Sequence, residues 1–422
     1  MTRRRPVLLV WLIGAGVVAL VANWIAASLS AQVQPDVAEY QAYAAAFWQH
    51  HQLPLEYPPM AILAIALPVS RPDSAYALLF GAWMGCFAVT AYFLVRWAGG
   101  AWAGVAFLGY LVAGAFATVL QRFDIVPATL VLAAYLALRE RRHNATYMLL
   151  AIGTLIKLFP AFLVPLVVID QYRSTRQAGS GEEVKAIGFG LGLFLAIVMG
   201  GFGLAFLVDS SHAIGPFRYA FSRPLEVESG PATLLWLTSF VGQPVHGAFS
   251  YGSFNLLGGG EADRWLGAIG GLVLVVGWTL AGAGLWRGRI EVGRAWIATL
   301  CVVLLSGKVL SAQYLIWLMP LIALVDGLDL VWLLVALSTT LVFPILFDHV
   351  TVQAGGILVY PGLLLATIAA RNGLLLFATL RELDWLGWER LRAHRYLGLG
   401  PAATERPALR GPRPIESSPV PR

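Results

Sequence analysis

Residues 186–207, AIGFGLGLFLAIVMGGFGLAFL, form a run without a single charged side chain. The hydrocarbon core of a bilayer is about 30 Å thick, and an α-helix needs about 20 apolar residues to cross it. This stretch therefore predicts a transmembrane helix. Similar apolar runs recur from one end of the chain to the other, so the same prediction extends to the whole fold.

The composition of the 422-residue chain excludes a water-soluble enzyme. Hydrophobic residues make up 58% of the chain, charged residues make up 12%, and the mean hydropathy is +0.72. Soluble domains carry about a quarter charged residues. Cys86 and Cys301 lie inside apolar stretches, which argues against a disulfide framework or a thiolate metal site. We expect an all-α, polytopic membrane helical bundle with broken hairpins and interfacial helices in its outer loops, and with no metal or cofactor.

The apolar pattern predicts twelve crossings and one half-helix. The first span covers about residues 7–29, and the polar residues 30–56 follow it as a surface helix. The apolar segment at residues 60–69 is too short to cross the bilayer, which predicts a re-entrant or interfacial half-helix. The later spans are predicted at about residues 75–95, 101–118, 124–138, 145–157, 159–170, 186–207, 265–286, 295–307, 312–325, 329–347 and 355–370.

The basic residues set the predicted orientation. The formal net charge is +6, but most Lys and Arg lie in short loops beside apolar runs, where topology accounts for them, and no nucleic-acid partner is expected. All but seven of the 29 basic residues fall on the cytoplasmic side, including Arg371 after the last span. Both termini are then cytoplasmic. We expect a membrane domain at residues 1–391 and a disordered tail at residues 392–422.

The seven exceptions lie outside or at membrane depth, and they are Arg71, Arg122, Lys157, Arg218, Arg223, Arg264 and Lys308. An ionisable group at membrane depth is costly and indicates a functional site. Arg122 and Asp124 lie at the tip of one predicted hairpin, Lys157 lies at the tip of a second, and Lys308 lies at the tip of a third. These residues are predicted to converge with Asp36 around a cavity that opens to the outside.

Other polar residues are predicted on the same side. Gln313 and Tyr314 follow the third tip, Arg223 and Glu228 belong to a loop at residues 208–230, and His349 marks another outer end. Lys and Arg bind phosphate by charge and hydrogen bonds, and a carboxylate accepts a proton from an attacking hydroxyl. The pattern favours an anionic lipid-linked donor and a hydroxyl acceptor.

Several sequence blocks then carry a family resemblance. Asp36-Val-Ala-Glu-Tyr40 and Glu56-Tyr57-Pro-Pro resemble the first outer loop of GT-C-type glycosyltransferases that use polyprenyl-phosphate sugars. Three later runs add to the likeness, and they are residues 156–160 (IKLFP), 222–229 (SRPLEVES) and 308–320 (KVLSAQYLIWLMP). Together the blocks resemble glycosyltransferase family 87 and related membrane mannosyltransferases.

The resemblance implies an inverting sugar transfer at the outer membrane face, plausibly of mannose, to a lipid or glycan acceptor, without a nucleotide-sugar site. Asp36 matches the acid that serves as catalytic base. Lys308, Gln313 and Tyr314 match the block that approaches the donor phosphate, and Tyr40, Glu56 and Tyr57 belong to the first-loop blocks. Arg223 and Glu228 match a motif to which no role is assigned. The stretch before Tyr57 lacks the usual Gly-x-x-Tyr, which leaves the acceptor preference open.

Structural explanations exist for several of these residues. Asp36 follows Pro35 at a plausible helix start and could cap that helix. Lys157 and Lys308 could extend to the interface, and Arg122 and Asp124 could form a structural ion pair.

Two alternative functions remain open. A transporter or lipid-linked sugar flippase also uses broken helices and buried charges, although no internal repeat is evident. A non-catalytic scaffold would leave the polar cluster unexplained.

Overall fold

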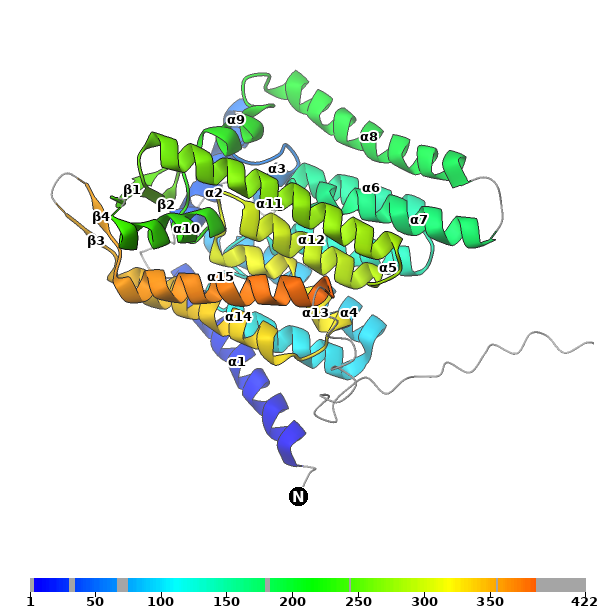
Figure 1. Cartoon of the computed structure of the whole chain (residues 1–422), viewed down its shortest axis with the longest axis horizontal. Coiled ribbons are helices and arrows are strands. Elements are labelled where there is room, and N and C mark those ends of the chain that lie inside the picture. The colour runs from blue at the N-terminus through cyan, green and yellow to red at the C-terminus, as the bar shows by residue number, and fades with distance from the viewer. Residues whose placement is uncertain are drawn as a thin grey trace, which may run out of the picture.

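The structure is a computed structural model that describes residues 4–29, 35–66, 75–178, 183–242, 244–353 and 356–384. The predicted tail at residues 392–422 and the outer basic residue Arg71 lie outside these ranges. The described chain is predominantly helical (Figure 1), which confirms the predicted fold class.

Six helical segments are long and apolar enough to cross a membrane, judged by length and composition. The fifth continues α14 through a π-helical turn, η4, and a 3-10 turn, η5. The six comprise α1 (Arg4–Leu29), α4 (Tyr76–Gly114), α8 (Glu183–Val208), α11 (Gly260–Trp286), α14 (Leu330–Thr340) with η4 (Leu341–Leu346) and η5 (Phe347–His349), and α15 (Gly362–Glu382). The predicted total of twelve crossings stays a prediction.

Shorter helices complete the bundle and its connections. Several of them correspond to the short spans expected from the sequence, and residues 159–170 and 312–325 are each divided into a 3-10 turn and an α-helix. The short elements are α2 (Pro35–His50), α3 (Ala61–Ala66), α5 (Ile125–Arg139), α6 (His143–Ile156), η1 (Phe159–Leu163), α7 (Val164–Ala178), α9 (Gly215–Ser222), α10 (Gly230–Thr238), η2 (Ser239–Val241), α12 (Val292–Ser306), η3 (Ala312–Trp317) and α13 (Met319–Val325).

Two regions of the structure differ from the predicted spans in where their helices begin and end. The spans expected at residues 75–95 and 101–118 are the two arms of α4, which bends at Gly100, where φ is +83°. Such a φ is readily adopted only by glycine, so the sequence permits the reversal at that residue. The last span, predicted at residues 355–370, is wrong at both ends, because α15 runs from Gly362 to Glu382.

A small antiparallel sheet was not predicted. It consists of β1 (His246–Ser250), β2 (Ser253–Leu257), β3 (Thr351–Val352) and β4 (Leu358–Val359), in the order β2-β1-β4-β3. The sheet lies with α2, α9 and α10 at one end of the bundle (Figure 1), which we call the sheet end. An isolated bridge between Glu226 and Asn255 joins the 208–230 loop to β2.

Large side chains and close glycine contacts pack the bundle. Tyr40, Tyr147, Trp296 and Trp332 are among the largest fully buried side chains. A Cβ on Gly190 of α8 would lie 2.3 Å from the Tyr147 ring of α6, so the glycine lets these two helices approach closely. Small residues commonly allow such close approach between membrane helices.

Candidate active site

Asp36 and Arg122 form an ion pair at the sheet end. Asp36 lies in the first turn of α2, and Arg122 belongs to the turns that join α4 to α5. The Arg122 side chain is 6% exposed, whereas the Asp36 side chain is 35% exposed. The buried guanidinium therefore holds a carboxylate that a second molecule can still reach.

A second ion pair lies close by and connects two helix breaks. Lys157, where α6 ends in extended backbone, donates from Nζ to Asp124 Oδ1 over 2.6 Å. The indole Nε1 of Trp317, in η3, donates to the same oxygen over 2.6 Å. We call Asp36, Arg122, Asp124 and Lys157 the charged cluster. Two of the predicted hairpin tips, with Arg122, Asp124 and Lys157, meet Asp36 of α2, and the third hairpin reaches them through Trp317 of η3.

Aromatic rings enclose the charged cluster. The Lys157 ammonium lies 4.5 Å from the centre of the Tyr314 ring and 5.1 Å from that of Phe123. The predicted residues Tyr40 and Tyr57 both pack edge-on against Phe123, with ring centres 5.5 and 4.9 Å away. Such rings exclude water and attract cations, and they strengthen the electrostatic interactions of the buried charges.

Glu56 adds a further carboxylate to this region. Its Oε1 accepts a hydrogen bond from the Tyr43 hydroxyl over 3.4 Å, and the same hydroxyl donates to Glu39 over 3.1 Å. Burial raises the pKa of Glu56, while hydrogen bonds from Tyr57 and Tyr219 and the charge of Arg223 oppose the rise. Burial also raises the pKa of Glu39, and the charge of Glu56 adds to it. The two acids share one electrostatic environment.

Two arginines near these carboxylates each have a nitrogen that donates no hydrogen bond. Arg223 hydrogen-bonds Ser253 Oγ over 3.0 Å and lies 5.4 Å from the Tyr219 ring centre. Within the described chain, Nε of Arg223, Nε of Arg122 and Oδ2 of Asp124 are buried and have no hydrogen-bond partner. Buried polar groups are normally satisfied, so these atoms retain hydrogen-bonding capacity that the described chain does not use.

Lys308, which matches the block that approaches the donor phosphate, binds backbone carbonyls in the structure. Its Nζ donates to the backbone carbonyls of Phe221 and Arg223, over 2.9 and 3.3 Å. Its own carbonyl accepts from the Glu226 amide over 2.9 Å. Lys308 therefore fixes the end of α9, and through it the backbone of Arg223, against the chain that leads into η3.

Of the remaining predicted residues, some lie beside the charged cluster and one does not. Tyr314 stacks on Trp317, with ring centres 4.4 Å apart, and so belongs to the enclosure. Gln313 is half-buried on the same 3-10 turn. His349 is exposed, and its Nδ1 pairs with the Ile345 carbonyl one turn earlier, over 3.2 Å. The described structure therefore does not bring His349 to the charged cluster.

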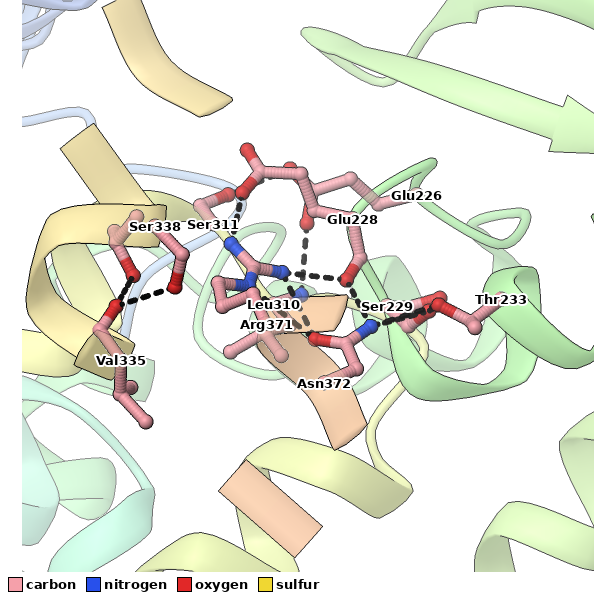
Figure 2. A network of polar contacts seen from close by, with 11 residues as sticks. Glu226, Glu228, Ser229, Thr233, Leu310, Ser311, Val335, Ser338, Arg371 and Asn372 are labelled. Carbon is pink, nitrogen blue, oxygen red and sulfur yellow. Dashed lines mark hydrogen bonds and ion pairs between the residues drawn. The ribbon is translucent and has the colours of Figure 1, made fainter. Parts of the chain in front are cut away.

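Glu228 forms a separate buried network with Arg371 and Asn372 of α15 (Figure 2). Arg371 donates from Nη1 to Glu228 Oε2 over 2.5 Å and from Nη2 to the Glu228 carbonyl over 2.7 Å. The two side chains are 3% and 5% exposed. Asn372 Nδ2 donates to the Glu228 carbonyl and to Thr233 Oγ1, over 3.0 and 2.7 Å. Arg371 therefore lies inside α15 and not after the last span, where the sequence predicted it.

Glu226 connects that network to the residues directly before η3. Its carboxylate accepts from the Leu310 amide over 2.8 Å and from Ser311 Oγ over 2.5 Å. Figure 2 shows Glu226 and Glu228 on the same side of the Arg371 guanidinium. Glu226 therefore supports the backbone before Tyr314 and Trp317, whereas the carboxylate of Glu228 pairs with Arg371.

Sequence reasoning missed Trp317, Tyr219, Arg371 and Asn372 as partners. A signal existed for Arg371 and Asn372, because the apolar pattern resumes after them as Leu374-Leu-Leu-Phe-Ala378. That continuation places both residues inside a helix, where an ionisable group needs a partner. No comparable signal distinguished Trp317 from the other tryptophans.

The Trp317→Phe variant tests the Asp124 contact. Phenylalanine retains the stack on Phe159, whose ring centre is 4.0 Å away, but it removes the donor to a buried carboxylate. Because hydrogen bonds to charged groups contribute about 1.5–3 kcal/mol, thermal unfolding in detergent should show a loss of that size. Trp278→Phe removes a bond to the neutral Phe162 carbonyl and should cost less. An equal or smaller loss for Trp317→Phe would contradict this role of Asp124.

Glu56→Gln tests the buried carboxyl. Since burial raises the folded-state pKa of Glu56 above its ordinary 4.5, the folded protein holds this proton more tightly than the unfolded chain. Ionisation therefore destabilises the wild type as pH rises from about 4.5 through the raised pKa. The variant should melt at a higher temperature than the wild type at pH 8, and the difference should shrink towards pH 4.5. The exposed Glu261→Gln serves as the matched control.

Comparison with known proteins leaves the family open. No protein-family model matches the chain, and no curated protein matches it. The structure is similar to the crystal structure of ArnT from Cupriavidus metallidurans bound to undecaprenyl phosphate. The match covers 90% of this chain and 77% of that chain, with 14% sequence identity and a TM-score of 0.46. A likeness at this level assigns no function, and membership of glycosyltransferase family 87 stays a prediction.

Proposed function

We propose that the protein is a membrane glycosyltransferase that moves a sugar from a polyprenyl-phosphate donor to a hydroxyl of a lipid or glycan acceptor. The observation that carries the proposal is the pairing of a reachable carboxylate, Asp36, with a buried arginine, Arg122, that retains an unpartnered donor. The sequence blocks shared with polyprenyl-phosphate-dependent enzymes support the same reaction, with mannose as a first candidate sugar.

The proposed reaction is one inverting displacement. Asp36 takes the proton of the acceptor hydroxyl as its oxygen bonds to the anomeric carbon. The bond between that carbon and the phosphate oxygen breaks, and polyprenyl phosphate leaves with the electron pair. Arg122 and Arg223 would stabilise the growing charge through their free Nε donors. The arginine geometry suits phosphate, since the guanidinium presents several donors in one plane.

Lys157 has a different proposed role from the one expected for a phosphate ligand. Its ammonium is committed to Asp124 and surrounded by Phe123, Tyr314 and Trp317. Lys157 would hold Asp124 and the surrounding rings in place and make the local electrostatic potential more positive. Lys308, bound to two backbone carbonyls, would position Arg223. In this proposal neither Lys157 nor Lys308 contacts the polyprenyl-phosphate sugar directly.

The test is an assay of the purified full chain with a panel of polyprenyl-phosphate sugars and candidate acceptors. Mass spectrometry should detect a new glycosidic product and free polyprenyl phosphate in equal amounts. In sealed vesicles, movement of the donor lipid without covalent change would instead identify a flippase and overturn the proposal. The same measurement with vesicles of either orientation would test the predicted outward-facing site.

A further inference from the structure

A cavity of about 700 Å³ opens where α5 turns into α6. It lies between the first turn of α6, the middle of α7 and the start of α8. Its charged and polar lining consists of Arg141, Arg142, His143, Asn144, Gln171 and Lys185. Small-molecule sites usually enclose about 300–1,000 Å³, so the cavity has the size of a ligand site.

This cavity is separate from the charged cluster. Asp124 precedes α5 and Lys157 follows α6, whereas His143 begins α6. α6 contains 14 residues, and an α-helix rises 1.5 Å per residue, so the two places are about 20 Å apart. A ligand in the cavity cannot contact Asp36 or Arg122 at the sheet end.

The lining has an excess of positive charge. Arg142 and Lys185 are exposed, and Arg141 shares its charge with Asp170 over 3.3 Å. None of the described lining residues is acidic. His143 Nε2 is buried and has no hydrogen-bond partner in the described chain, whereas Gln171 Oε1 already accepts from Tyr147. The two exposed cations suit an anion with several acceptor oxygens.

Apolar surface continues from the charged lining. Phe189, which also lines the cavity, is 64% exposed, and Val184 of α8 and Met148 of α6 are exposed as well. α8 is one of the helices long and apolar enough to cross the bilayer, so we expect Val184 and Phe189 to face lipid. The cavity thus offers phosphate-binding donors at one edge and a hydrocarbon surface at the other.

We propose that this cavity binds the headgroup of an anionic phospholipid. The phosphate lies among Arg142, His143 and Lys185, and an acyl chain follows Phe189 along α8. Basic pockets between transmembrane helices bind acidic headgroups by the same combination of charge and hydrocarbon contact. The binding is independent of the transferase reaction, and its test needs no enzymatic assay.

Native mass spectrometry of the full chain in detergent tests the proposal with phosphatidylglycerol and phosphatidylcholine of identical acyl chains. Phosphatidylglycerol should be retained preferentially. Each basic residue near an anionic headgroup contributes about fivefold in affinity, so the double variant Arg142→Gln/Lys185→Gln should bind about 25-fold more weakly. The control Arg287→Gln/Arg289→Gln removes two exposed arginines at the turn between α11 and α12 and should bind as the wild type does.

Three results would overturn the proposal. The first is equal retention of the two lipids, and the second is an equal loss of binding in the control variant. The third is displacement of lipid by inorganic phosphate that itself depends on Arg142 and Lys185, because the ligand would then be a free phosphate. If the double variant fails to fold, Lys185→Gln alone should still show about a fivefold loss.

Discussion

Asp36→Asn should abolish sugar transfer and leave the fold intact. General-base catalysis contributes about 10²–10⁴-fold to a rate, and the amide cannot accept the proton of the acceptor hydroxyl at neutral pH. Asparagine still offers an oxygen to Arg122, so the contact between α2 and the loop before α5 survives. Turnover of a polyprenyl-phosphate sugar should fall by that factor, while the melting temperature in detergent changes little.

The control separates catalysis from charge loss in general. Glu261→Gln removes an exposed acid at the start of α11, outside the charged cluster, and should retain wild-type turnover. Asp36 would be excluded as the base if its asparagine variant turned over at the wild-type rate. A fall in turnover matched by a large fall in melting temperature would instead favour the structural explanation, in which Asp36 serves mainly to hold Arg122.

Arg371→Met should cause the largest loss of stability. The variant removes the partner of Glu228 in a network where both side chains are almost fully buried, and methionine fills a similar length of helix surface. Breaking a buried ion pair from one side costs about 3–5 kcal/mol because the remaining charge has no counterion. Thermal or denaturant unfolding in detergent should register this loss.

The double variant Glu228→Met/Arg371→Met supplies the decisive comparison. Replacing both members of a buried pair by apolar residues is often neutral, so the double variant should recover much of the stability lost in Arg371→Met. The exposed Arg287→Met should have little effect. If the double variant were no more stable than the single one, the backbone carbonyl contacts of Arg371 would account for the loss, and the ion pair would not.

The sequence predicted the membrane fold and the core of the candidate site better than it predicted the supports around that site. Apolar length identifies helices because every lipid-exposed backbone group must be satisfied within its own segment. The same constraint makes Arg122, Asp124 and Lys157 conspicuous, since ionisable groups at such positions need partners. Their convergence with Asp36 followed from topology alone.

The sheet and the Arg371 network were missed for physical reasons. The strands are two to five residues long, and they obtain their stability from tertiary packing, which leaves little local pattern. Arg371 was misassigned because an arginine next to an apolar run also satisfies the orientation rule. Lys308 binds the carbonyl of Arg223, and whether an ammonium binds a ligand or a carbonyl depends on neighbours that are distant in sequence.

The stack between Phe159 and Trp317 has a consequence for how a long lipid phosphate could enter. These rings join η1 to η3 face to face, and Trp317 also binds Asp124 at the start of α5. Three helix breaks are thereby fastened into one rigid wall. Asp36 lies on α2 and Arg223 directly follows α9, so we expect donor access and acceptor access to depend on how far those two short helices can separate.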